Sequence, residues 1–265
     1  MHSKLIINAD DFGLCPSVND AILELAAEGC LTSTTIIANF VKNDELELLR
    51  NTNIGTGLHI NLIEGAPLSS PDEINTIVDK KGIFYPAGKL WVQTLMGKVN
   101  PLHIDKEITA QFRFLANNGI TISHIDSHKH LHQFPYLGYL ILNTVTKLGI
   151  RRVRYCNPLH PSSVRMSLVK GMSLMTSNSI KPFSHPDGLV SYFSAHPNGN
   201  FNVLEKEITN LFLKYSCLEI MTHPALENKT GSYLNHRAEF EFLKLNVKQR
   251  ISKVKGIELI NYNHL

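Results

Sequence analysis

Short runs of β-branched and apolar residues alternate with segments of helical periodicity along the whole chain. The first such run covers residues 5–8 and the last covers residues 257–260. Between the first two runs, residues 17–28 repeat apolar side chains at near-helical spacing, and Gly29 stands where a helix C-cap belongs. Strands separated by helices of this length predict βαβ units and a mainly parallel sheet. We therefore expect an α/β fold.

The same alternation predicts the remaining elements. We expect strands at residues 32–38, 56–60, 120–125, 152–155 and 218–221, and helices at residues 43–50, 105–117, 136–148, 203–215 and 237–253. Six or seven strands without an internal repeat or a sustained change of composition favour one deformed (β/α) barrel over residues 1–265, forming a single catalytic domain. An open doubly wound sheet is the alternative, although no GxGxxG follows the first strand.

Two long segments interrupt this rhythm, at about residues 62–101 and 157–202. Both are rich in Pro and Gly, and the first contains the only tryptophan, Trp91. Loops of this length in a compact domain commonly form lids or the walls of a binding site. We expect insert loops here, and neither segment has the character of a linker between domains.

Composition and charge narrow the class of protein. The 26 Lys and Arg residues nearly balance 23 Asp and Glu residues, and no basic run suggests a nucleic-acid partner. No stretch approaches the ~18 apolar residues of a membrane span, and the apolar run near the N-terminus is too short for a signal peptide. Four cysteines without a CxxC pair indicate thiols in a reducing compartment, so we expect a cytoplasmic protein.

Acidic residues and histidines follow four of the predicted strands. Asp10 and Asp11 follow the first, His59 lies near the end of the third, residues 124–132 continue the fourth, and His223 follows the strand at 218–221. Barrels and open sheets both build their active sites beyond the carboxyl ends of their strands. We therefore expect these side chains to meet at one rim.

Each of these residues also has a purely structural interpretation. The two aspartates could form a turn, His59 could be a buried strand histidine, and His223-Pro224 could begin a loop. Residues 124–132 are different, because four histidines and one aspartate within nine residues have few structural uses. In a strand, residues 128, 130 and 132 would share a face, whereas in a helix 124, 128 and 132 would.

Two imidazoles and one carboxylate with open positions suit Zn²⁺, Fe²⁺ or Mn²⁺, and suit Mg²⁺ less naturally. The thiol ligands of a structural zinc site are missing, so a catalytic metal is expected. Adjacent carboxylates also suit a divided role, in which one binds the metal and its neighbour accepts a proton. The sequence contains no GxSxG, P-loop or HExxH motif.

Several motifs closely resemble the YdjC-like carbohydrate deacetylase family, which includes chitooligosaccharide (chitobiose) deacetylases and is related to the polysaccharide deacetylases. They occur in the same order over almost the whole chain. The motifs are Asn8-Ala9-Asp10-Asp11-Phe12-Gly13, Thr32-Ser33-Thr34-Thr35, Gly57-Leu58-His59-Ile60-Asn61-Leu62, Glu64-Gly65-Ala66-Pro67-Leu68, residues 124–132, Thr222-His223-Pro224, and Thr230-Gly231-Ser232-Tyr233 followed by Arg237 and Glu239. Ala225 departs from the glycine that the family usually has after His-Pro.

The resemblance implies a deformed (β/α) barrel that removes the N-acetyl group from an acetylated amino sugar or short chitooligosaccharide. It implies one divalent metal ion, Mg²⁺ or Zn²⁺, held by Asp11, His59 and His128, with Asp10 as general base and His223 as general acid. The ligand set alone favours Zn²⁺. We interpret a further set of residues as substrate contacts or as partners that orient the ligands: Asp126, His130, His132 and Arg237.

The sequence also fits other functions. The pattern His124-Ile125-Asp126 with His223 also matches the facial triad of non-haem iron oxygenases, which however are generally jelly rolls. A metal-dependent phosphoesterase, another amide hydrolase, or a sugar-binding protein without turnover would fit the same barrel. Trp91, Phe84 and Tyr85 either stack on sugar rings or pack a lid, and we favour the lid. A homodimer is possible.

Overall fold

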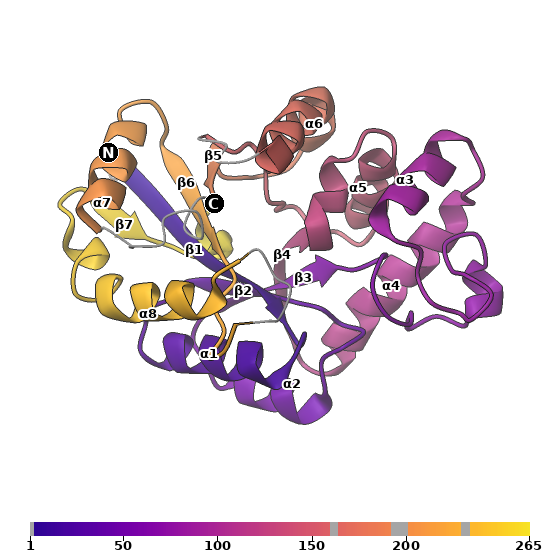
Figure 1. Ribbon diagram of the computed structural model, residues 1–265, viewed down its shortest axis with the longest axis horizontal. Coiled ribbons are helices and arrows are strands. Elements are labelled where there is room, and N and C mark those ends of the chain that lie inside the picture. Colours follow the sequence, from indigo (N-terminus) through magenta and orange to yellow (C-terminus); the bar gives the residue numbers. More distant parts are fainter. Residues whose placement is uncertain (1–2, 160–163, 192–200, 229–233) are drawn as a thin grey trace.

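Parallel strands form one curled sheet at the centre of the molecule in the computed structural model, which describes residues 3–159, 164–191, 201–228 and 234–265 (Figure 1). The strands lie in the order β4-β3-β2-β1-β6-β5, and each of these neighbouring pairs is parallel. Their bounds are β1 Ser3–Phe12, β2 Ser33–Ile36, β3 Gly55–Ile60, β4 Ile122–Ser127, β5 Gly188–Val190, β6 Cys217–Thr222 and β7 Ile257–Leu259. The prediction of a mainly parallel α/β fold is confirmed.

β1 is the central strand of this sheet. It pairs with β6 from Lys4 to Ala9, whereas on its other edge β7 pairs with its first residues and β2 with later ones. Buried side chains occupy every position from Leu5 to Phe12. A strand covered on both faces explains the continuous apolar run, which ends in the two aspartates.

The segment from residue 151 to residue 159 links the two outer strands of the sheet. It bridges to β4 through Ile125 and Val153, and to β5 through Pro158 and Leu189. The Arg154 N–H donates to the Ile125 carbonyl over 2.9 Å. We expected a regular strand at 152–155, but the segment leaves β4 for β5 within a few residues, which allows only isolated bridges. These bridges curl the sheet toward a deformed barrel.

Helices surround the sheet, with α1, α2 and α8 along one side and α3, α4 and α5 around another (Figure 1). The α-helices are α1 Pro16–Ala27, α2 Asn43–Arg50, α3 Ala87–Leu95, α4 Pro101–Asn117, α5 Leu137–Lys147, α6 Val164–Ile180, α7 Phe201–Leu211 and α8 His236–Asn246; the 3₁₀ helices are η1 Pro71–Ile74, η2 His128–Gln133, η4 Ile251–Lys253 and η5 Tyr262–His264. Every helix predicted from periodicity is present, although α8 is shorter than expected. No helix among the described residues has both the length and the apolar character that crossing a bilayer requires.

Both segments expected as insert loops contain regular structure. The first holds α3, and the second holds α6 and β5. The Trp91 indole donates to the Pro135 carbonyl over 3.2 Å and packs edge-on against Phe134, with ring centroids 5.4 Å apart. Phe84 is buried in the core. These two aromatic side chains therefore pack within the protein.

The interior of the sheet also contains a close contact between a glycine and a histidine. A Cβ atom on Gly57 would lie 2.5 Å from Cε1 of His124, so only glycine leaves room for this ring beside β3. On its other side, His124 stacks on Tyr262 with ring centroids 3.7 Å apart and planes 5° apart. The ring is thus held between a strand and the C-terminal η5.

We expect Gly57→Ala to destabilise the protein by about 1–3 kcal/mol, because the added methyl group overpacks the His124 ring. The matched control is Gly171→Ala in α6, where a Cβ atom meets nothing within 4 Å. Alanine there should be neutral or stabilising by up to about 1 kcal/mol. Urea unfolding of both variants tests the contact, and equal stabilities would contradict it.

Candidate functional site

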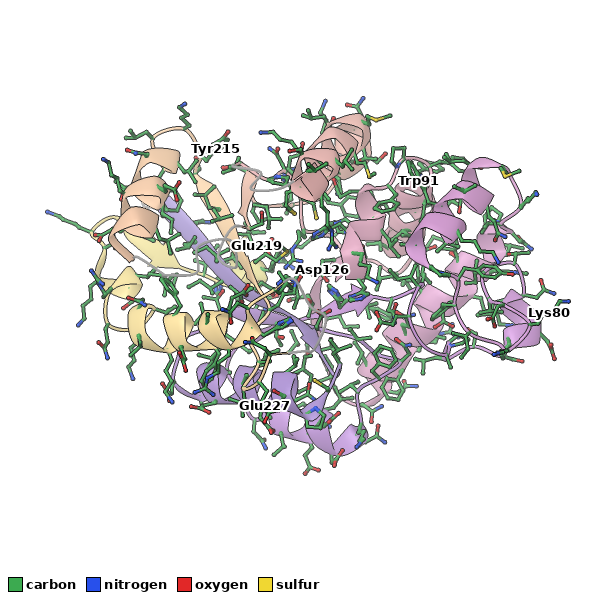
Figure 2. The ribbon with its side chains drawn as sticks, viewed as in Figure 1. Lys80, Trp91, Asp126, Tyr215, Glu219 and Glu227 are labelled. Carbon is green, nitrogen blue, oxygen red and sulfur yellow. The ribbon has the colours of Figure 1, made fainter. Side chains whose placement is uncertain are left out.

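The four strands predicted to carry chemistry deliver their side chains to one rim. β1 carries Asp10 and Asp11 near its carboxyl end, β3 carries His59, β4 carries Asp126 just before His128, and His223 follows β6. Because these strands are parallel, their carboxyl ends lie at the same edge of the sheet. Figure 2 shows Asp126 between the strands, near the middle of the molecule.

Asp11, His59 and His128 form a compact group at this rim. Oδ1 of Asp11 lies 3.2 Å from Nε2 of His59 and 3.1 Å from Nδ1 of His128. The three candidate ligand atoms lie within 4.8 Å of one another, and all three residues are largely buried. One oxygen and two imidazole nitrogens converging on one point fit a divalent metal such as Zn²⁺.

The backbone at Asp11 supports a special role for this residue. Asp11 has a φ of 71°, in the left-handed region that residues other than glycine rarely occupy. Such strain persists where the surrounding structure imposes it, and it concentrates at functional sites. Burial opposes ionisation of Asp11, but hydrogen bonds with His128 and His59 outweigh it and hold the pKa of this carboxyl well below its usual range.

His59 is oriented by Asp126, which lies beside it on β4. Nδ1 of His59 donates to Oδ1 of Asp126 over 2.6 Å, and the Thr35 hydroxyl donates to Oδ2 of Asp126 over 3.1 Å. This arrangement leaves Nε2 of His59 facing Asp11. A carboxylate commonly orients a metal-ligating histidine in the same way. Burial disfavours the charged imidazole, but Asp126 and Asp11 together raise the pKa of His59 to about 10 in the metal-free protein.

His128 is held from both of its ring nitrogens. Nδ1 faces Asp11, and Nε2 lies 3.1 Å from Oε2 of Glu64, in the loop after β3. Glu64 was part of a motif but had no assigned role, and nothing in the spacing indicated that its carboxylate reaches His128 in η2. Lys129 and His130, with φ of 54° and 61°, turn the chain sharply after His128. This turn is neither the strand nor the helix considered for residues 124–132.

Asp10 is excluded from this group by its own partners. Its carboxylate binds Arg154 in a bidentate pair, with Nη1 and Nη2 each 2.6 Å from one oxygen, and the Asn8 amide donates to Oδ1 over 2.9 Å. Nε2 of His223 lies 3.7 Å from Oδ2 of Asp10. The pair Asp10 and His223 therefore sits beside the three candidate ligands without competing for them.

Arg154 is the residue that sequence reasoning missed. Besides Asp10, it pairs with Asp126 over 2.5 Å and with Glu219 over 2.7 Å, and its side chain is fully buried. A second cluster of acidic and histidine side chains, Asp10, His59 and Asp126, also has the spacing of metal ligands. Its carboxylates are already neutralised by Arg154, which makes the group around Asp11 the better candidate. The only signal in the sequence was an arginine inside a predicted strand.

The other histidines of residues 124–132 lie away from the three candidate ligands. Nδ1 of His132 is 2.5 Å from the Ser127 hydroxyl, and its Nε2 donates to the Arg154 carbonyl over 3.0 Å. Nδ1 of His130 lies 3.4 Å from Sγ of the buried Cys156. His132 thus supports the segment that carries Arg154, while His130 packs on a thiol.

His223 is fixed through its backbone. Its N–H donates to Oε2 of Glu239 over 2.6 Å, and its carbonyl accepts a hydrogen bond of 2.7 Å from Nδ1 of His236. Ala225 does not have a positive φ, so the glycine usual at this position in the family is not required here. Both anchoring side chains, Glu239 and His236, belong to α8.

Arg237 also lies on α8, and its guanidinium donates hydrogen bonds to the Glu241 carboxylate and the Leu226 carbonyl. Neither partner belongs to the rim group, and nearly half of the Arg237 side chain is exposed. The motif at residues 230–233 lies outside the described residues.

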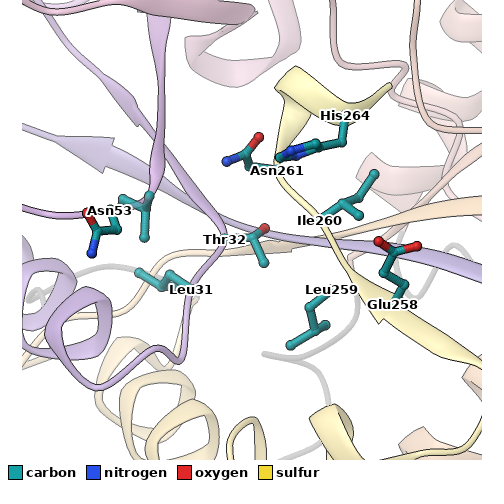
Figure 3. A pocket seen from close by; sticks show the side chains of 9 residues that line it. Leu31, Thr32, Asn53, Glu258, Leu259, Ile260, Asn261 and His264 are labelled. Carbon is teal, nitrogen blue, oxygen red and sulfur yellow. The ribbon is translucent and has the colours of Figure 1, made fainter.

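A separate hollow of about 240 Å³ lies at the opposite end of the sheet, before β2 and β3 and beside β7 (Figure 3). Its lining residues are Leu31, Thr32, Asn53, Ile54, Glu258, Leu259, Ile260, Asn261 and His264. None of the rim residues lines it, so this hollow is separate from the group around Asp11.

We expect the rim to bind Zn²⁺ through Asp11, His59 and His128. In a calorimetric titration of chelator-treated protein, Asp126→Asn should weaken binding by about 10–100-fold, because the partner that orients His59 is lost. His59→Ala removes a ligand and should weaken binding further. His264→Ala, at an exposed histidine, is the matched control and should bind as the unaltered protein does. Unchanged affinity in His59→Ala would contradict the assignment.

Buried neutral histidines should make the metal-free protein sensitive to acid. Burial lowers the pKa of His124 to about 3 and that of His132 to about 4, against about 6.5 in an unfolded chain. As the pH falls from about 6.5 toward 4.5, the unfolded chain gains protons there that the folded protein does not, so the free energy of unfolding falls. Each histidine lowers the free energy of unfolding by up to about 1.4 kcal/mol for each pH unit in this window.

Urea unfolding at several pH values in this window measures that slope. His124→Gln should reduce the slope, because one buried neutral imidazole is removed, whereas His264→Gln should leave it unchanged. A slope that is the same in all three proteins would contradict a neutral, buried His124.

The chain is similar to a family of known proteins and to individual relatives. A model of the family described as YdjC-like protein matches residues 4–251. The chain is 38% identical over 276 residues to a chitooligosaccharide deacetylase of Yersinia enterocolitica, covering 99% of each chain. It is 38% identical over 128 residues to a carbohydrate deacetylase of Thermoanaerobacter pseudethanolicus, covering 48% of this chain and 50% of that protein.

A solved structure is also similar over its full length. The crystal structure of a putative cellobiose-phosphate cleavage protein from Enterococcus faecalis superposes with a TM-score of 0.79 at 26% identity, covering 100% of this chain and 99% of that one. Together with the family model, which spans nearly the whole sequence, these similarities show that the chain belongs to the YdjC-like protein family.

Proposed function

We propose that this protein is a metal-dependent carbohydrate deacetylase, which hydrolyses the N-acetyl group of an acetylated amino sugar or short chitooligosaccharide to acetate and a free amine. The observation that carries the proposal is that the rim holds two neighbouring groups, the candidate metal ligands and the pair of Asp10 and His223. Asp11, His59 and His128 converge as candidate ligands, while the adjacent Asp10 is held apart from them within 3.7 Å of His223. The names of the Yersinia and Thermoanaerobacter relatives support this substrate class.

Asp11, His59 and His128 would hold the divalent ion. One carboxylate and two imidazoles favour Zn²⁺ over Mg²⁺, which prefers oxygen ligands. When bound, such an ion polarises an amide carbonyl and lowers the pKa of water. Asp126, Thr35 and Glu64 would keep the two histidines in the required orientation, as their contacts with the rings indicate.

Asp10 and His223 would move the protons. Asp10, as general base, would take a proton from the attacking water, and Arg154 and Asn8 hold its carboxylate in place. His223, as general acid, would protonate the departing amine nitrogen, and its backbone is anchored to α8. Nε2 of His223 lies 3.7 Å from Oδ2 of Asp10, so one bound substrate would be within reach of both groups.

Acetate release from N,N′-diacetylchitobiose, by protein stripped of metal and reconstituted separately with Zn²⁺, Mg²⁺ and Mn²⁺, tests the proposal. We expect release that requires a metal ion. Asp10→Asn should retain Zn²⁺ binding and lose about 10²–10⁴-fold in turnover, the usual contribution of a general base. Full activity in Asp10→Asn would contradict the role assigned to Asp10.

The name of the Enterococcus structure, a putative cellobiose-phosphate cleavage protein, favours a phosphorylated disaccharide as a second candidate substrate, and a phosphoesterase on the same barrel would act on it. The same metal-reconstituted protein should therefore be assayed for phosphate release from a disaccharide phosphate. Phosphate release without acetate release would replace the deacetylase proposal, whereas acetate release alone would support it.

A further inference from the structure

A buried chain of polar contacts runs from the C-terminus of the protein to Asp10. The Tyr262 hydroxyl in η5 donates to Oε2 of Glu219 over 2.6 Å. Oε1 of Glu219 in turn accepts from Nε and Nη2 of Arg154, over 2.9 and 2.7 Å. At the other edge of the guanidinium, Nη1 and Nη2 of Arg154 donate to the two oxygens of Asp10. Figure 2 shows Glu219 on β6, close to Asp126 in the interior.

The contacts of Arg154 account for all five of its N–H donors. Nε and one hydrogen of Nη2 serve Glu219, the second hydrogen of Nη2 and one of Nη1 serve Asp10, and the last faces Asp126. The guanidinium is planar and rigid, so the carboxylate at one edge sets the orientation of the other edge. Glu219 is thus the group that aims Arg154 at Asp10.

Glu219 is itself oriented by Tyr262. One of its oxygens is occupied by Arg154, and the hydroxyl of Tyr262 binds the other. The Tyr262 ring is held by its stack on His124 and packs with Ile6, Cys217 and Ile260. The C-terminal segment is tied to β1 by a hydrogen bond from the Ile260 N–H to the Leu5 carbonyl, 3.0 Å long, and lies beside the hollow of Figure 3.

We infer that Tyr262 and Glu219 are positioning residues, which act on the reaction at the rim by holding Arg154, and through it Asp10, from the opposite end of the sheet. This inference rests on the proposed role of Asp10 as general base. A carboxylate that must accept a proton from a water molecule depends on the direction of its lone pairs, so a small rotation of Arg154 lowers turnover. The three candidate metal ligands touch neither Tyr262 nor Glu219 in the described contacts.

The substitution Tyr262→Phe tests this inference because it removes one oxygen and keeps the stack on His124. We expect kcat for acetate release from N,N′-diacetylchitobiose to fall roughly tenfold, the value of one hydrogen bond to a charged group. KM and the affinity of the chelator-treated protein for Zn²⁺ should stay unchanged. Tyr215→Phe, the same chemical change at a residue without a described side-chain hydrogen bond, is the matched control and should keep full turnover.

A double-mutant cycle separates positioning from a general loss of structure. If Tyr262 acts through Asp10, Tyr262→Phe should cause little further loss in a protein that already carries Asp10→Asn. The same tenfold loss in both backgrounds would overturn the inference, as would unchanged kcat in Tyr262→Phe. Equal activity of Asp10→Asn and the unaltered protein would instead overturn the role of Asp10.

Glu219→Gln provides an independent route if Tyr262→Phe does not fold. The amide keeps the size of the side chain but removes the charge that faces Arg154, so we expect a larger loss of kcat than in Tyr262→Phe, again with unchanged affinity for Zn²⁺. A loss of Zn²⁺ affinity comparable to that of His59→Ala would show that Glu219 supports the ligands rather than Asp10, and would overturn the inference.

Discussion

One buried arginine joins the three strands that matter most for the rim. Arg154 contacts Asp10 on β1, Asp126 on β4 and Glu219 on β6, and it is fully buried. Removing one partner of a buried ion pair typically costs about 3–5 kcal/mol, because the remaining charge is left without compensation. Each of these carboxylates can therefore lie in the interior only because the guanidinium is present, and the geometry of the rim depends on it.

The contacts of Arg154 also give two neighbouring residues different roles. Asp10 and Asp11 are adjacent in sequence, yet Asp10 turns toward Arg154 while the left-handed backbone of Asp11 turns its carboxylate toward His59 and His128. Asp126 connects the two sides, since it contacts Arg154 with one oxygen and His59 with the other. A group suited to hold a cation and a group suited to accept a proton can thus lie side by side without sharing ligands.

Much of the fold and the centre of the site could be predicted from local patterns. The helices α1, α2 and α4 follow directly from periodicity, because each buries one regular face, whereas the strands before Asp10 and His59 are short runs that are buried on both faces. The helices in the two long segments were missed for different reasons: Pro- and Gly-rich surroundings concealed the short amphipathic α3, and the 17-residue α6 has no clear apolar stripe. The conformation of residues 124–132 was also unpredictable, because two consecutive left-handed residues other than glycine follow no propensity rule.

The sequence by itself determined the parallel α/β architecture and the presence of acids and histidines at one rim, because both depend on periodicity and on the ends of parallel strands. Only the tertiary structure decided how those groups are used. Arg154, Glu219 and Tyr262 meet although they are 43 or more residues apart, and His124 lies inside the sheet because Gly57 leaves room for its ring. Such contacts arise from the packing of distant segments, for which no local pattern of residues provides a signal.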